Sequence, residues 1–324
     1  MKLNKEKFAE RLIESLKIYL PEDIAQRKMS VETMNKNNGV VLTGILIAGE
    51  KGGPVFYIDK LYDMYVNDEL SVAEIVKNSS REIVNGIRTE EAILNNFNVD
   101  TLLDDKDRIK MLIHDVDIPN CRLDECETYI PSAYSEDLIA SFKVVLSETE
   151  RGTACVDITK SMAKMLNITG EELYNICLEN AYGKDIRLSN MEDILFYGGQ
   201  TNLYNSPELL SKQNFNTSIY VLTNSNSNMG ASHILNPKVA EKVSEILGGS
   251  YYVIPSSIHE TLILPDDGNA AEAKELECMV REVNSTEVKP EEVLSDKVFY
   301  YDEVTKCLDN AMDREKEKDF SPRL

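Results

Sequence analysis

The sequence lacks tryptophan, long apolar runs and an apolar N-terminal leader. Its most apolar segment, residues 40–48, is interrupted by Thr43 and Gly44 and is far shorter than the ~20 apolar residues that a membrane-spanning helix needs. The first residues, Met-Lys-Leu-Asn-Lys-Glu-Lys-Phe, include lysines but are not followed by an apolar stretch or a small-residue cleavage site. We therefore predict a cytoplasmic protein with no signal peptide and no membrane partner.

Positive charge is also scarce. The chain has 35 lysines and arginines against 56 aspartates and glutamates, which gives a net charge of -21. A negative field of this size repels phosphate backbones and anionic lipid headgroups. The basic residues do not cluster with aromatic residues, as they do on many nucleic-acid-binding surfaces. We expect no nucleic-acid partner, and we interpret the acidic surface as solvated rather than as a docking face.

Cysteines and glycine-rich loops give no metal or phosphate signature. Six cysteines are scattered along the chain, and only Cys121 and Cys126 lie close together, which favours free thiols over a zinc site. The glycines at 49–53 and 248–249 mark turns rather than phosphate loops. The available metal ligands in the second half lack a recognised spacing: His233, His259, Glu260, Glu282 and Asp296. We predict neither a cofactor nor a bound metal.

What is present is typical of a globular protein. The 324 residues are 42% apolar and 28% charged, enough for one large domain or two ordinary ones. Residues 119–131 form an irregular segment with two cysteines, and we place a division there. The predicted parts are 1–118, with a helix, a strand meander and further helices, and 119–324, an α+β part. One continuous domain is the alternative.

The first part begins with a helix signal. Asn4 is a suitable N-cap, apolar residues recur at helical spacing behind it, and Pro21 ends the pattern. Short β-branched and aromatic runs at 30–34, 40–48 and 55–58 are separated by turn residues rich in asparagine and glycine. This arrangement predicts a meander of three strands.

Capping boxes indicate where two further helices begin. Ser71 is followed three residues later by Glu74, and Thr169 by Glu172, in the spacing that lets each side chain bond the other residue's backbone N–H. A separate helical segment is predicted at 89–97.

Residues 219–265 form the most strongly patterned stretch of the chain. A β-branched and aromatic run predicts a strand, after which Asn236 and Pro237 begin a helix that the glycines at 248–249 end. Two more strands follow, the second through residues 256–264. The whole sequence therefore predicts an α+β fold of mostly antiparallel sheets covered by helices and built from recurring strand and helix units.

The segment Ser256-Ser257-Ile258-His259-Glu260 has the composition of a hydrolytic site. In a strand, Ser257 and His259 share one face and Glu260 points to the other, so an orienting carboxylate must come from elsewhere. No Gly-x-Ser-x-Gly elbow presents a nucleophile. The simpler interpretation is that these side chains satisfy backbone groups near a sheet edge. We assign no catalytic residue and keep Ser256, Ser257, His259 and Glu260 as candidates.

Glu260 falls in the same strand phase as three aliphatic residues. A carboxylate on a buried face needs a partner, and Arg281 in the helix predicted at 270–283 is available. A structural ion pair is the simpler interpretation, and a general acid is the alternative.

Several segments resemble a known family: Tyr220-Val-Leu-Thr-Asn, Ile254-Pro-Ser-Ser-Ile-His-Glu, Met279-Val-Arg-Glu-Val-Asn, Val293-Leu-Ser-Asp-Lys-Val, Asn35-Lys-Asn-Asn-Gly-Val and Asp137-Leu. The family consists of uncharacterised bacterial proteins, is catalogued as a domain of unknown function, and is common in anaerobic gut bacteria and their mobile elements. The resemblance implies a soluble bacterial protein that forms one continuous unit. It carries no activity over to any residue.

Three functions follow as hypotheses. The first is a non-catalytic binding or interaction protein that holds a protein partner or a small ligand in a cleft near His259. The second is a serine-type hydrolase that uses Ser257 or Ser256 with His259. The third is an acidic immunity or anti-defence protein that neutralises a basic partner.

Overall fold

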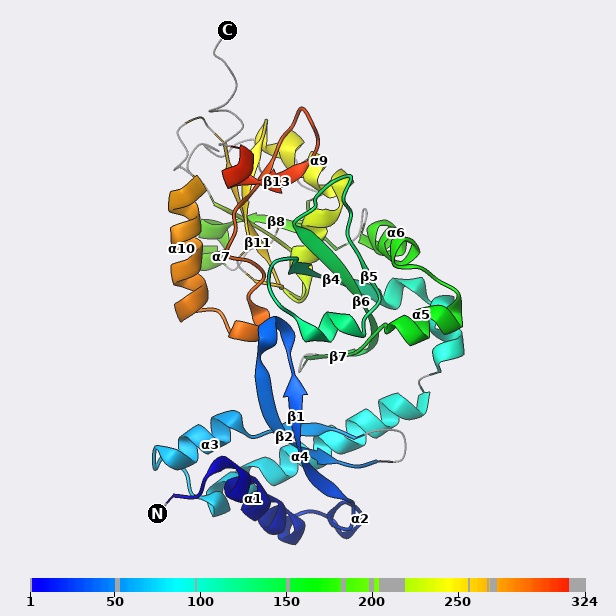
Figure 1. Ribbon diagram of the computed structural model, residues 1–324, viewed down its shortest axis with the longest axis vertical. Helices are drawn as coiled ribbons and strands as arrows, with labels where there is room; N and C mark the ends of the chain where they lie inside the picture. Colours follow the sequence, from blue (N-terminus) through cyan, green and yellow to red (C-terminus); the bar gives the residue numbers. More distant parts are fainter. Residues whose placement is uncertain are drawn as a thin grey trace. The chain divides into compact units, whose positions relative to one another are not determined.

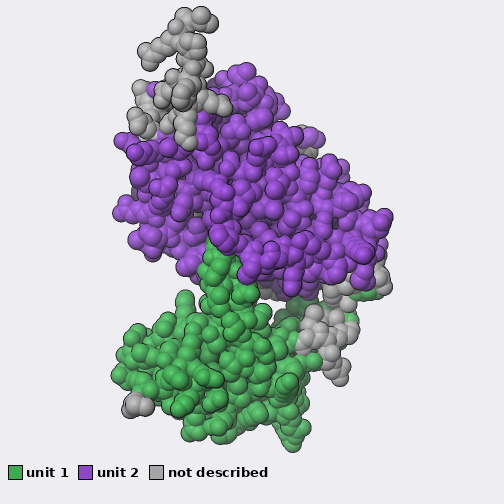
Figure 2. All heavy atoms as spheres, in the orientation of Figure 1, with its two compact units in different colours: residues 1–99 green, residues 100–324 purple. Residues whose placement is uncertain are grey.

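The computed structural model describes residues 2–49, 53–96, 98–149, 152–181, 185–197, 201–203, 219–255, 257–266, 268 and 273–314. The chain divides into two compact units, unit 1 at Met1–Val99 and unit 2 at Asp100–Leu324 (Figure 2). Both contain helices and antiparallel sheets (Figure 1), which confirms the predicted α+β fold. Within the described ranges, no helix is both long and apolar enough to cross a membrane.

The division between the units lies before strand β4 (Ile109–Asp115), which pairs with β6 (Leu138–Thr149) inside unit 2. The division predicted after residue 118 separates these two strands. It followed from the irregular segment 119–131, which resembles a linker when only the local pattern is considered. Strands β4 and β6, which pair with each other, lie on either side of this segment. A local pattern does not reveal a pairing between residues this far apart in the sequence.

Unit 1 contains helices around a three-stranded sheet in the order β1-β2-β3, which confirms the predicted meander. Asn38 and Gly39 have φ values of 60° and 69° in the turn between β1 and β2, where asparagine and glycine are the residues best suited to positive φ. In chain order its elements are α1 (Lys5–Tyr19), α2 (Glu22–Ala25), β1 (Met29–Asn35), η1 (Asn37–Gly39), β2 (Val41–Ile47), β3 (Val55–Tyr57), α3 (Asp59–Val66) and α4 (Val72–Asn96).

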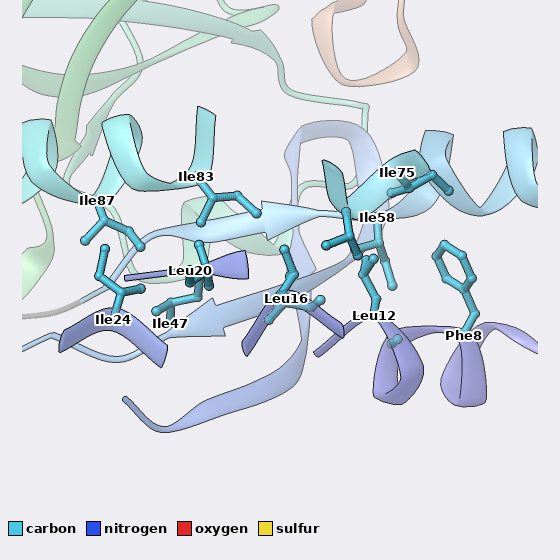
Figure 3. Close-up of a cluster of buried hydrophobic side chains, with 13 residues drawn as sticks. Phe8, Leu12, Leu16, Leu20, Ile24, Ile47, Ile58, Ile75, Ile83 and Ile87 are labelled. Carbon is cyan, nitrogen blue, oxygen red and sulfur yellow. The ribbon is translucent and has the colours of Figure 1, made fainter. Parts of the chain in front are cut away.

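A buried apolar cluster joins α1 and α4 to this sheet (Figure 3). Phe8, Leu12 and Leu16 recur every four residues on α1, so they lie on one face of the helix and are fully buried. Burying each such side chain contributes roughly 1.5–3 kcal/mol. Unit 1 therefore has its own core, made by Phe8, Ala9, Leu12, Leu16, Leu20, Ile24, Ile45, Ile47, Ile58, Ile75, Val76, Ile83 and Ile87.

Helix α4 is a single helix of 25 residues, whereas the sequence predicted two shorter helices in this region. Ile83 and Ile87 pack into the core one turn apart on either side of Gly86, so tertiary packing outweighs the weak helix propensity of glycine. The capping box at its start is confirmed. The backbone N–H of Ser71 donates to Glu74 at 2.9 Å, and the N–H of Glu74 donates to Ser71 Oγ at 3.4 Å.

Unit 2 contains two antiparallel sheets in its described part. The first is built around β6, which pairs with β4, β5 (Thr128–Tyr129) and β7 (Gly152–Asp157). Helix α6 (Gly170–Ala181) contacts β4, β5 and β6. Its predicted capping box is confirmed, because Thr169 N donates to Glu172 at 2.9 Å and Glu172 N donates to Thr169 Oγ1 at 3.2 Å.

The second sheet has the strand order β13-β12-β10-β11-β9-β8. Helix α10 covers one of its faces through Leu276 and Val280, which pack with Val298 and Tyr300. The strands are β8 (Arg187–Asn190), β9 (Tyr220–Thr223), β10 (Tyr251–Ile254), β11 (Thr261–Pro265), β12 (Phe299–Tyr301) and β13 (Leu308–Asn310). The other elements are α5 (Lys160–Leu166), α7 (Met191–Tyr197), α9 (Pro237–Leu247), α10 (Ala273–Thr286), η2 (Val99–Asp104), η3 (Lys106–Arg108), η4 (Cys121–Asp124), η6 (Gly230–Leu235) and η7 (Pro290–Glu292).

The predicted order of strand, helix, strand and strand within residues 219–265 is confirmed as β9, α9, β10 and β11. Asn236 caps α9 by accepting from Lys238 N at 3.1 Å, and Gly248 ends it with a φ of 83°. One boundary differs from the prediction. Strand β11 begins at Thr261, not at residue 256, so the alternation of faces expected for residues 257–260 does not apply.

Candidate functional site

Residues 257–260 form a turn held by its own hydrogen bonds. Ser257 N donates to the carbonyl of Glu260 at 3.3 Å, and Ser257 Oγ accepts from the backbone N–H of His259 at 3.1 Å. The serine hydroxyl is therefore engaged with the backbone two residues on, in the local pattern common for serine in turns. Ser256, the other candidate nucleophile, lies outside the described residues.

The His259 ring contacts a neighbouring loop. Its Nδ1 accepts from the backbone N–H of Met229 at 3.3 Å, and its Nε2 lies 3.8 Å from Glu292 Oε1. An Nδ1 that accepts a hydrogen bond carries no proton, so the ring proton of the neutral imidazole is on Nε2. In this arrangement His259 supports the position of Met229.

The ion pair expected between Glu260 and Arg281 does not form among the described residues. Arg281 Nη2 is 2.9 Å from Glu277 Oε2, one turn earlier on the same helix. The prediction was wrong because it placed Glu260 on a buried strand face, whereas Glu260 lies in the turn before β11 and is only half-buried.

The C-terminal end of β4 lies in a buried polar network. His114 Nε2 is 2.9 Å from Ser141 Oγ, and its Nδ1 is 3.4 Å from Asn120 Nδ2. Burial, together with the positive charges of Lys143 and Arg122, lowers the pKa of His114 to about 3. His114 is therefore neutral at pH 7, and both ring nitrogens have a polar neighbour.

The next residue on β4, Asp115, is only 3% exposed and its charge is compensated. Lys297 Nζ lies 3.0 Å from Asp115, 2.7 Å from Asp117 and 3.0 Å from Asp137, and the Ser295 hydroxyl also donates to Asp115. Burial alone lowers the pKa of Lys297, but the hydrogen bonds that its ammonium group donates to the three carboxylates outweigh this effect and raise that pKa well above its ordinary value. This cluster fixes the segment before β12 to the end of β4.

The N-terminal end of β4 borders a cavity with a volume of about 190 Å³. Its walls come from β4 and β6, from the C-terminal turn of α6, from the loop 224–229 and from η6 and the residue after it. The lining residues of this cavity do not include Ser257, His259 or Glu260. The cavity therefore differs from the cleft that the sequence predicted around His259.

His233, on η6, is the cavity residue with an unsatisfied polar atom. Its Nε2 is shielded from solvent and has no hydrogen-bond partner among the described residues, although the residue as a whole is only half-buried. Burial, together with the charge of Lys110, lowers the pKa of His233 to about 4. The ring is neutral at pH 7 and can donate or accept one hydrogen bond at the open nitrogen.

Lys110 on β4 supplies the positive charge at the cavity. It makes no ion pair with any described residue, whereas both acidic residues of the lining are engaged. Asp185 accepts from Ser225 N at 3.3 Å and lies 3.4 Å from Arg187, and Glu148 accepts from Asn226 at 2.7 Å. Among the described residues, Asp185 is thus paired with Arg187, Glu148 has a neutral hydrogen-bond donor, and Lys110, whose side chain is exposed, has no ion pair.

The loop 224–229 is held in one conformation by its asparagines. Asn224 Nδ2 donates to the carbonyl of Asn228 at 2.8 Å, and Asn224 Oδ1 accepts from the backbone N–H of Asn228 at 3.1 Å. Asn228 Nδ2 donates to Thr153 Oγ1 at 2.9 Å, which ties the loop to β7. Met229 ends the loop with a φ of 55°, a conformation that L-residues seldom adopt, and its N–H is held by His259.

Gly230 explains why the loop can lie so close to its neighbours. A Cβ at this position would come within 2.4 Å of Thr223 Oγ1 and within 2.7 Å of the His259 carbonyl oxygen. Only glycine permits this approach of three backbone segments. Residue 259 is thus coupled to the cavity loop through its backbone as well as through its ring.

The thiol of Cys177 also lies at the cavity. Burial raises the pKa of Cys177 to about 12, so the thiolate is not available at neutral pH. The hydroxyl of Ser232 donates to the Met229 carbonyl at 2.9 Å. In the described part of the chain, no three histidine, cysteine, aspartate or glutamate side chains are placed to hold a metal ion.

Sequence reasoning missed this cavity. It considered His233 only as a metal ligand, and it did not single out Lys110. Two signals were present: Lys110 interrupts the apolar run Ile-Lys-Met-Leu-Ile, and three asparagines alternate with serines at 224–228. A charge within a strand of an otherwise buried pattern is a reason to look for a ligand or a partner.

These features define an α+β protein with a small cavity, lined by both polar and apolar residues, in its second unit. The model of a family described as "Family of unknown function (DUF5688)" matches residues 5–303, and the chain belongs to this family. No curated protein and no solved structure matches the chain. The family match covers parts of both units, and it assigns no role to any residue.

Proposed function

We propose that this protein is a non-catalytic binding protein that holds a small polar ligand in the cavity at the N-terminal end of β4. The observation that carries the proposal is the Nε2 of the neutral His233, which has no partner among the described residues, in a cavity lining that also contains Lys110. Buried polar atoms in folded proteins nearly always have a hydrogen-bond partner. A ligand that bonds His233 would supply the partner that the chain does not.

The volume of the cavity supports a small ligand. At about 190 Å³ it is smaller than the ~300–1,000 Å³ of pockets that enclose drug-sized molecules. A compound of metabolite size fits this volume better than a nucleotide or a folded peptide segment.

The walls of the cavity support binding by a preformed site. Asn224 and Asn228 fix the loop internally, Asn228 and Thr153 fix it to the first sheet of unit 2, and His259 fixes its end. A site whose walls are already ordered loses little conformational entropy when a ligand enters.

The state of the nearby nucleophiles supports a role in binding rather than catalysis. The Cys177 thiol is protonated at neutral pH, and the Ser232 and Ser257 hydroxyls are engaged with backbone groups. An activated nucleophile needs either a lowered pKa or an adjacent base. Among the described residues, the hydrogen bond found at Ser257 Oγ comes from the backbone N–H of His259 and not from a side-chain base.

The test is a binding screen on the full-length protein with a defined panel of small sugars, amides, amino acids and hydroxy acids, followed by ligand-observed NMR. We expect at least one class to bind and the Ala181→Leu variant to lose that binding, because residue 181 lines the cavity and the larger side chain occupies part of it. Glu179→Leu is the matched control, since it adds the same side chain at an exposed position of the same helix outside the lining.

Absence of binding across the panel contradicts the proposal. Binding that survives Ala181→Leu unchanged also contradicts it, because the ligand then sits elsewhere.

A further inference from the structure

The charges of the cavity select the sign of a ligand. Glu148 and Asp185 already have partners, and Lys110 has no ion-pair partner among the described residues. The positive charge of Lys110 adds to the effect of burial in lowering the pKa of His233, and it opposes the rise that burial causes in the pKa of Cys177. A ligand carboxylate placed at Lys110 forms the ion pair that this lysine lacks, whereas a cation placed there is repelled by the ammonium group.

The side-chain amides of Asn180 and Asn228 indicate which hydrogen-bonding groups the ligand carries besides its charge. The Nδ2 atoms of Asn180 and Asn228 donate to protein atoms, Lys106 O and Thr153 Oγ1 respectively. Their Oδ1 atoms accept no hydrogen bond from any described residue, and both residues line the cavity. These two oxygens are acceptors, so the groups that satisfy them are donors such as hydroxyl or amino groups.

We infer that the ligand is a small carboxylate that also carries a hydroxyl or amino group, with its carboxylate at Lys110 and its donor at Asn180 or Asn228. The inference rests on the proposed function of the cavity. The open nitrogen of His233 provides one further hydrogen bond to either end of such a molecule.

A carboxylate fits this lining better than a phosphate does. A carboxylate brings a single negative charge to Lys110, whereas a phosphate monoester carries about -1.5 to -2 at pH 7. The lining also includes the two carboxylates of Glu148 and Asp185, which repel additional negative charge. Phosphate-binding sites typically combine backbone N–H groups of a glycine-rich loop with several cations, whereas Gly230, which follows the cavity loop, is required for close backbone packing.

The test uses full-length protein and four probes: lactate, its neutral amide lactamide, propionate, which lacks the hydroxyl group, and inorganic phosphate. Affinities are measured by titration of backbone amide NMR signals of unit 2. We expect lactate to bind about ten-fold more tightly than lactamide, because a hydrogen bond to a charged group is worth more than a neutral one. We expect propionate to bind more weakly than lactate and phosphate to bind weakest.

Lys110→Gln removes the positive charge, and it should reduce lactate affinity about ten-fold while leaving lactamide affinity unchanged. Lys164→Gln, an exposed lysine on α5 outside the cavity, is the matched control and should change neither. Equal affinities for lactate and lactamide, or tighter binding of phosphate, overturn the carboxylate inference and leave the proposed function standing. Failure of these probes and of the whole panel overturns both.

Discussion

The two ends of strand β4 differ in how their polar groups are satisfied. At the C-terminal end, His114 has polar neighbours at both ring nitrogens, and the buried Asp115 is paired with Lys297. At the N-terminal end, Lys110 has no ion pair among the described residues, and His233, which lines the same cavity, has a ring nitrogen without a partner. Both regions contain a neutral histidine and a lysine, so composition alone does not separate them.

This difference separates structural groups from candidate binding groups. A polar network whose members satisfy one another contributes to folding and specificity, and breaking it is costly. A polar group left open beside a cavity contributes little to folding and is available to a ligand.

Lys297→Met should produce the largest loss of stability. It leaves Asp115 buried without its ion-pair partner, and removing one member of a buried pair typically costs about 3–5 kcal/mol. The free energy of unfolding is measured by urea titration followed by resolved NMR signals of unit 2. A loss below about 1 kcal/mol would show that Asp115 does not depend on Lys297.

Acid should destabilise unit 2 through His114 and His233. The folded-state pKa values are about 3 for His114 and about 4 for His233, both below the ordinary value of 6.5. Above about pH 6.5 these histidines are neutral in both states, so they contribute nothing to the pH dependence of stability. Below that pH they take up protons in the unfolded chain but not in the folded chain. Each then removes stability at about 1.4 kcal/mol per pH unit as the pH falls toward its folded pKa.

The His233→Leu variant isolates one of these contributions. Its stability curve between pH 6.5 and pH 4 should be shallower than the native curve by about 1.4 kcal/mol per pH unit, since carboxylates contribute equally to both proteins and cancel. Parallel curves in this range would mean that His233 is protonated in the folded state.

The His259 ring should act on the cavity through Met229 N. Asparagine places an amide oxygen near the position of Nδ1, whereas glutamine does not, so His259→Asn should retain the bond and His259→Gln should lose it. Loss of one hydrogen bond costs about 0.5–1.5 kcal/mol, and ligand affinity should fall by a corresponding few-fold factor in the glutamine variant only. Identical affinities for the two variants, measured by NMR titration with lactate, argue against this positioning role.

The smallest effect is expected for the stability of His233→Leu at pH 7. The substitution removes a polar atom that has no partner, so the free energy of unfolding should stay within about 0.5 kcal/mol of the native value or rise slightly. A loss of 2 kcal/mol or more, comparable with the loss expected in the satisfied network, would place His233 among the structural residues.

The elements that could be predicted from the sequence depend on short-range interactions. The caps at Asn4, Ser71 and Asn236 involve residues two or three positions apart, and all three make the expected hydrogen bonds. The strand order within residues 219–265 was accessible for the same reason, since turn residues and β-branched runs are local signals.

The cavity could not be predicted because its walls come from distant parts of the chain. Lys110, Asn180 and His233 meet only after β4, α6 and η6 pack together, and none of them belongs to a motif with a recognised spacing. The interpretation of Glu260 failed for a related reason. It assumed strand alternation through a segment that hydrogen bonds of Ser257 turn into a bend before β11 begins.

The most direct test of the contrast between the two ends of β4 is the ¹⁵N NMR spectrum of the histidine rings during titration with lactate. We predict that the ring nitrogen signals of His233 shift with saturation while those of His114 stay unchanged, because both His114 nitrogens have protein partners and the Nε2 of His233 has none among the described residues. Ring signals of His233 that do not move, or that move together with those of His114, would contradict the account.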